Sequence, residues 1–202
     1  MIAIAALAFC AGVGRTWLET RRDRWIAAGI GLALAAWGGV AADEALRPFA
    51  VGLAGLLAAL AWIDIRMLRL PNFLTAAVAA LGAAMVAITA PGDWIHHAAG
   101  GAAGYGALVA VEVGYRALKG RDGLGRGDAK LLGALGVWTG WTGLPIILLA
   151  ASASGLIFAI VAAAARGEAL SGRARLAFGP FLALGGWAAW LYGGDLLGLQ
   201  YS

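Results

Sequence analysis

The sequence predicts an all-α membrane protein, a polytopic bundle of about eight transmembrane helices that forms one domain over residues 1–202. Hydrophobic residues make up 62% of the chain and charged residues only 13%, against roughly 45–50% and 25% in soluble domains. The mean hydropathy is +0.83. Long apolar runs recur along the whole chain and leave no polar block of the roughly 50 residues that a soluble domain needs.

Eight apolar segments are candidate spans. They cover residues 1–14, 25–42, 48–64, 72–90, 98–118, 130–142, 144–165 and 177–198. Several are shorter than the ~20 residues of a straight span, and the sixth has the length of a re-entrant or tilted piece, so six or seven spans remain open. The first segment resembles a signal peptide, but its basic residues follow it, and we interpret it as a retained span. The 32 glycines predict close helix packing.

The basic residues predict the orientation in the membrane. Fourteen of the 15 Lys and Arg residues fall on one side of this topology, and Arg47 alone falls on the other. Short loops rich in Lys and Arg stay cytoplasmic, so both termini are expected outside. The same distribution explains the net charge of +4 better than nucleic-acid binding, which we do not expect. Trp94, Trp138 and Trp141 are expected at the outer interface.

Two aspartates are the candidate catalytic residues. A carboxylate at bilayer depth costs roughly 2.5–3.5 kcal/mol, so one that is tolerated there usually has a partner, a water cavity or a task. Asp64 ends the third segment, just before a basic turn and Pro71, and a helix C-terminus disfavours an anion. Asp128 begins the sixth segment, where a helix N-terminus favours one. An aspartyl dyad uses such asymmetry, because one carboxyl is protonated while the other activates water. The structural alternative for Asp128 is a helix N-cap.

Glycine precedes Asp128 at positions 123, 125 and 127, which permits close backbone approach of an extended substrate. Glu112 and Arg116 are four residues apart in the fifth segment, a spacing at which two side chains meet on one helix face. We interpret this pair as structural, with a role in orienting the catalytic groups as the alternative. His96 and His97 are expected in an outer loop, and we expect no metal site there or elsewhere.

Three stretches in order resemble one known family. GLGRGDAKLLGALGVWTGW, from Gly123 to Trp141, resembles the GxGDxKLLAALGxWxGW stretch of bacterial type IV prepilin peptidases, the membrane aspartyl proteases with a GxGD motif. Asp64 with Leu70, Pro71, Asn72, Leu74 and Thr75 resembles the first-aspartate segment of that family, and LAFGPFLALG, from Leu176 to Gly185, resembles its C-terminal element. The resemblance covers roughly residues 50–195. It implies that Asp64 and Asp128 are the catalytic aspartates. We expect substrate-binding or supporting roles for Gly125, Gly127, Lys130, Pro71, Asn72 and Glu112.

The resemblance also implies substrates and a location. Members of the family cut the short basic leader from prepilin or pseudopilin precursors of type IV pilus and type II secretion systems. The cut falls on the cytoplasmic side of the bacterial inner membrane, usually after a glycine and just before the apolar helix of the mature subunit. We therefore expect a multi-pass inner-membrane protein in contact with the lipid bilayer, with its active site facing the cytoplasm.

One departure from the family concerns cofactors. Larger members carry, between their first two spans, a cytoplasmic domain with two Cys-x-x-Cys pairs that binds zinc and is associated with methylating the new N-terminus. Here the expected connection is only about ten residues, Arg15 to Arg24, and Cys10 is the single cysteine of the chain. We interpret the chain as a short form without that domain, and expect neither zinc nor S-adenosylmethionine as a cofactor, and no N-methyltransferase activity.

Other functions remain open at this point. A transporter could use Asp64 and Asp128 as proton-relay carboxylates, although such acids usually lie near the middle of the bilayer within paired halves. A structural subunit of an assembly platform would tolerate Asp64→Asn. A presenilin-like protease is the nearest alternative, but a tyrosine typically precedes the first aspartate of that group, and Ile63 precedes Asp64 here.

Overall fold

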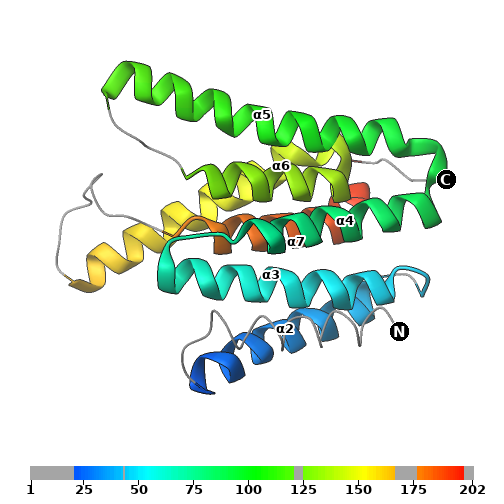
Figure 1. Ribbon diagram of the computed structural model, residues 1–202. Helices are drawn as coiled ribbons and strands as arrows, with labels where there is room; N and C mark the ends of the chain where they lie inside the picture. The colour runs from blue at the N-terminus through cyan, green and yellow to red at the C-terminus, as the bar shows by residue number, and fades with distance from the viewer. Residues whose placement is uncertain (1–20, 43, 121–124, 167–176, 198–202) are drawn as a thin grey trace.

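The protein is a bundle of helices that lie side by side (Figure 1). The computed structural model describes residues 21–42, 44–120, 125–166 and 177–197. Within these residues every regular element is a helix, which confirms the all-α prediction. The elements are α2 (Arg21–Ala41), α3 (Arg47–Met67), α4 (Asn72–Thr89), the short 3₁₀ helix η1 (Pro91–Asp93), α5 (Trp94–Lys119), α6 (Arg126–Arg166) and α7 (Gly179–Leu197).

The apolar segments predicted the bounds of five helices to within a few residues, because the sequence marks their ends. Pro48 lies in the first turn of α3, and Pro71 immediately precedes α4, which are positions that proline tolerates. Gly120, with φ 65°, ends α5 in the left-handed conformation common after a helix. Residues 21–24 belong to α2, so their assignment to a loop was wrong. The segment 1–14 lies outside the described residues.

α6 contains both the sixth and the seventh predicted segment. Its 41 residues are interrupted at Gly140, whose φ of 67° and ψ of −179° are not helical. The part of α6 before Gly140 runs in the same direction as α7. The two helices begin at the same end, at Asp128 in α6 and Gly179 in α7, and farther along both helices the rings of Trp138 and Trp190 meet. The part after Gly140 runs the opposite way, because Gly155 lies near Phe181 and Ile146 near Gly193. The chain therefore reverses at Gly140, and Figure 1 shows α6 doubling back.

Three described helices are long and apolar enough to cross a membrane: Arg47–Met67, Asn72–Thr89 and Arg126–Ala165. A membrane protein is therefore supported, while the count of eight spans stays a prediction. Figure 1 shows α2 and α5 at opposite edges of the bundle. α2 packs on α3, whereas α5 packs on the first part of α6.

Close contact between α5 and α6 confirms the packing predicted from the glycine content. A Cβ atom on Gly100 or on Gly136 would overlap the backbone of the other helix, and Gly104 and Gly133 face the partner helix with almost as little space. Small residues at such crossings let two backbones approach in lipid.

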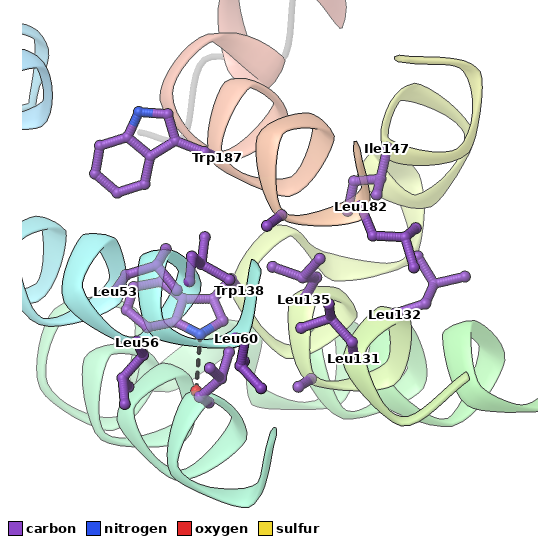
Figure 2. Packing of buried hydrophobic residues seen from close by; sticks show 14 of the residues in the cluster. Leu53, Leu56, Leu60, Leu131, Leu132, Leu135, Trp138, Ile147, Leu182 and Trp187 are labelled. Atoms are coloured by element: carbon purple, nitrogen blue, oxygen red, sulfur yellow. Dashed lines mark hydrogen bonds between the residues drawn. The ribbon is translucent and has the colours of Figure 1, made fainter. Parts of the chain in front are cut away.

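The core lies where α3, α4, α6 and α7 meet, and Figure 2 shows Leu131, Leu135 and Trp138 of α6 within it. Trp138 is 1% exposed, so its predicted place at the outer interface was wrong. Its Nε1–H donates a hydrogen bond to the Val78 carbonyl at 2.9 Å. A Cβ on Gly82 would lie 2.7 Å from that nitrogen, so Gly82 provides the space that the indole fills.

Candidate active site

Asp64 lies in the last turn of α3, and its side chain is buried. Its Oδ2 accepts a hydrogen bond of 2.9 Å from the backbone N–H of Gly179, the first residue of α7. A Cβ on Gly179 would lie only 2.7 Å from the same oxygen. The absence of a side chain at residue 179 therefore allows the start of α7 to approach the Asp64 carboxyl group.

Asp128 lies in the first turn of α6, and its side chain is partly buried. Its backbone N–H donates to the Gly125 carbonyl at 3.0 Å, so Asp128 is inside the helix and is not its N-cap residue. A Cβ on Gly125 would lie 3.3 Å from Oδ2 of Asp128. Gly125 therefore lies directly beside this carboxyl group, and the close approach of a substrate to the glycines stays a prediction.

Leu70 brings the segments of the two aspartates together. This buried side chain lies in the connection after α3 and packs against the start of α6, where a Cβ on Gly127 would lie 3.0 Å from Leu70 Cβ. It also packs against the start of α7, where a Cβ on Gly179 would lie 3.2 Å from Leu70 Cδ2. Leu70 therefore places the two carboxyl groups at the same end of the bundle. Two carboxylates close together repel each other, which favours a pair that shares one proton.

The helix ends around the pair differ from the expectation in one respect. Asp64 lies at the C-terminus of α3, as predicted, but the hydrogen bond from Gly179 also puts its carboxyl group at the N-terminus of α7. Asp128 lies at the N-terminus of α6. Both groups therefore face the positive end of a helix dipole. The dipoles of α3 and α6 alone do not decide which group holds a proton.

Asn72 and Lys130 connect the two aspartate-bearing regions a second time. Asn72 is the first residue of α4, and Lys130 Nζ donates to Asn72 Oδ1 at 2.7 Å. Thr75 Oγ1 donates to the Asn72 carbonyl at 2.9 Å, and Pro71 is buried with an extended backbone. The structure thus brings the predicted supporting residues from both motifs to the same end of the bundle.

Glu112 belongs to a neighbouring ion-pair cluster. Its buried carboxylate accepts a hydrogen bond from Arg116 Nη2 at 2.9 Å, as the spacing predicted, and Arg126 Nε lies 3.2 Å from its Oε2 and 3.3 Å from its Oε1. Only the Oε1 contact has hydrogen-bond geometry, and Oε2 has no hydrogen-bond partner among the described residues. Because Arg126 is the first residue of α6, Glu112 holds α5 against the helix start that carries Asp128.

The opposite end of the bundle contains a cavity of about 370 Å³ that neither aspartate lines. Its walls include Leu46, Met85, His97, Trp138, Trp190 and Gly193. His96 and His97 belong to α5, which begins at Trp94, so their assignment to a loop was wrong. His97 Nδ1 lies 2.9 Å from the Val137 carbonyl oxygen. In the described part of the chain, no three His, Cys, Asp or Glu side chains are grouped to hold a metal ion.

Sequence reasoning missed Gly179, Leu70 and Arg126 as residues that shape the site. Gly179 lies within the LAFGPFLALG stretch and Leu70 within the first-aspartate stretch, so their motifs were noticed but their contacts were not. The hydrogen bond between Gly179 and Asp64 spans 115 positions of the chain. No local pattern indicates such a contact.

The chain is similar to known proteins over most of this region. A model of the type IV leader peptidase family matches residues 50–160. The prepilin leader peptidase/N-methyltransferase of Aeromonas salmonicida is 37% identical over 147 residues, which cover 71% of this chain and 49% of the relative. The protein of the same name from Escherichia coli K12 is 40% identical over 160 residues, which cover 73% of this chain and 69% of the relative. The protein of that name from Xanthomonas campestris is 35% identical over 153 residues, which cover 73% of this chain and 51% of the relative.

The chain thus spans about half the length of the Aeromonas and Xanthomonas relatives. Among solved structures, none matches it.

Proposed function

This chain belongs to the type IV leader peptidase family, and we propose that it is an aspartyl endopeptidase that removes the short basic leader from type IV prepilin or pseudopilin precursors. The observation that carries the proposal is that Asp64 and Asp128 lie at the same end of the bundle. Leu70 packs against the backbone just before Asp128 and against Gly179, and the Gly179 N–H donates a hydrogen bond to Asp64. Two nearby carboxyl groups are what aspartyl peptide hydrolysis requires.

The proposed reaction needs one proton on the pair. The ionised carboxylate accepts a proton from a water molecule, whose oxygen attacks the scissile carbonyl, while the protonated carboxyl donates a hydrogen bond to the carbonyl oxygen. The tetrahedral intermediate then collapses, the C–N bond breaks, and the leaving amine takes a proton from the pair. The hydrogen bond from Gly179 to Asp64 restricts the rotation of that carboxyl group, so that it keeps one orientation towards water and substrate.

The location of the aspartates suits a substrate with an apolar helix. Both lie at the ends of helices that are long enough to span a bilayer. A precursor whose helix lies in the bilayer beside the bundle would present the start of that helix at the same level. The same end of the bundle carries Arg66, Arg69, Arg116, Lys119 and Arg126, whereas Arg47 lies at the other end. This bias supports an inner-membrane protein with its active site facing the cytoplasm.

We further propose that cleavage needs neither zinc nor S-adenosylmethionine. Cys10 is the only cysteine in the chain, so the chain cannot supply the four-cysteine ligand set of a structural zinc site. The proposed reaction uses water and protein carboxyl groups alone.

A cleavage assay tests the proposed function. The purified protein in detergent is mixed with a type IV prepilin, and the product masses are measured by mass spectrometry, with the Escherichia coli relative as the positive control. We expect a product shorter by the leader alone, cut after its terminal glycine. A precursor that stays intact under conditions in which the relative cuts it would contradict the proposal.

A further inference from the structure

Leu68, the residue that ends α3, has an unusual backbone conformation. Its φ of 51° and ψ of 41° lie in the left-handed region, and it is the only residue other than glycine with a positive φ in the described ranges. Glycine, and less often asparagine, usually takes this position after a helix, because a Cβ atom is strained there. A leucine at this place therefore calls for a role of its side chain.

The side chain of Leu68 lies outside the hydrophobic core. Leu68 is 46% exposed and is absent from the core, whereas its neighbours Met67 and Leu70 both pack against or within it. Ile65, three residues earlier, is 52% exposed and also lies outside the core. We call these two exposed apolar residues at the end of α3, Ile65 and Leu68, the α3 end surface.

The α3 end surface adjoins the candidate active site. Ile65 directly follows Asp64, and the backbone N–H of Leu68 donates to the Asp64 carbonyl at 2.8 Å. Two residues later, Leu70 packs against Gly127 and Gly179 beside the two aspartates. Figure 1 shows the turn between α3 and α4 at the end of the bundle where α6 and α7 begin. A peptide bond positioned at the aspartates would have its neighbouring residues within reach of this surface.

We propose that the α3 end surface, with Leu68 as its main contact, binds the apolar residues that follow the scissile bond of the precursor. This inference rests on the proposed leader peptidase function. The side chain of Leu68 is exposed outside the core, and its burial against apolar substrate residues supplies binding free energy. Because a contact of this kind is present in both the bound substrate and the transition state, its loss raises KM and leaves kcat nearly unchanged.

Two substitutions separate substrate contact from structure. Leu68→Gly removes the side chain and relieves the positive φ, so we expect a Tm equal to or above that of the wild type. Leu68→Asn keeps a side chain that tolerates this conformation and replaces its apolar surface. Each variant should lower kcat/KM for a type IV prepilin about fivefold by raising KM. An effect of this size is expected when roughly half of a leucine side chain is buried against the substrate.

The matched control is Leu118→Asn. Leu118 is 85% exposed in the last turn of α5, the helix that forms the outer edge of the bundle (Figure 1). This variant should leave kcat/KM unchanged. If Leu68 instead contacts lipid without touching substrate, Leu68→Asn will cleave the prepilin with the wild-type KM, which overturns the inference. A fall in the Tm of Leu68→Gly would also overturn it, because the side chain would then be structural.

A change on the substrate completes the test. The first apolar residue after the scissile bond is replaced by serine, and kcat/KM is measured for all combinations of enzyme and substrate. We expect Leu68→Asn to lose its effect on the altered precursor, since contacting residues are non-additive. Full additivity would refute the contact. Failure of the wild-type protein to cut any precursor would instead refute the proposed function.

Discussion

Gly179→Ala should slow cleavage while the protein still folds. The added Cβ would lie 2.7 Å from Asp64 Oδ2 and 3.2 Å from Leu70 Cδ2. Because Gly179 does not have a positive φ, alanine fits its backbone, and the strain falls on the Asp64 carboxyl group. That group must turn away and lose the 2.9 Å hydrogen bond from the Gly179 N–H.

The magnitude follows from that bond. A hydrogen bond to a charged group contributes about 1.5–3 kcal/mol, so a comparable loss in the transition state lowers kcat/KM about 10- to 150-fold. The assay is prepilin cleavage by purified protein, with Tm measured on the same preparation. Gly106→Ala is the control, because a Cβ there meets nothing within 4 Å and alanine favours a helix by up to about 1 kcal/mol. A folded Gly179→Ala protein that cleaves at the Gly106→Ala rate would refute the positioning role of this N–H group.

Three further outcomes are expected. A plot of kcat/KM against pH should be bell-shaped, since cleavage depends on one proton shared by Asp64 and Asp128. Isolated carboxyl groups titrate at about pH 4. A kcat/KM that stays constant from about pH 4 to 9 would contradict a dyad. Gly82→Ala should lower the free energy of unfolding by about 1–3 kcal/mol by overpacking against Trp138, which thermal unfolding measures; an unchanged Tm would contradict that packing. Cleavage should persist in strong chelator. Labelled S-adenosylmethionine should leave no label on the mature N-terminus, and label there would contradict the proposal that the chain cuts without methylating.

Much of the fold could be predicted because membrane helices are specified locally. Apolar runs bounded by Pro71, Gly120 and clustered arginines gave helix ends close to those of α3, α4 and α5. The two parts of α6 were also visible in the sequence as two apolar segments. What no segment pattern indicates is that the break falls at Gly140, where the positive φ and the closely packed His96 ring leave no room for a Cβ.

The candidate site was predictable only in part, for a similar reason. Asp64 and Asp128 each stand at the edge of an apolar run, and this position made them candidates. Their surroundings depend on contacts across the bundle: the N–H of Gly179 on Asp64, and Lys130 on Asn72. Trp138 shows the same limit, since a tryptophan near a segment end suggested an interface, whereas Gly82 on another helix provides a buried place for it.

The central claim is that the two aspartates act as one unit in leader cleavage, and the most direct test compares Asp64→Asn, Asp128→Asn and the double variant. Asparagine keeps the shape of the side chain but can neither share a proton nor activate water. Each single variant should insert, fold and accumulate like the wild type but cut prepilin at least about 10²-fold more slowly. Each should also cut no faster than the double variant, because the effects of residues that act as a unit are not additive. Near-normal cleavage by either single variant would contradict the account.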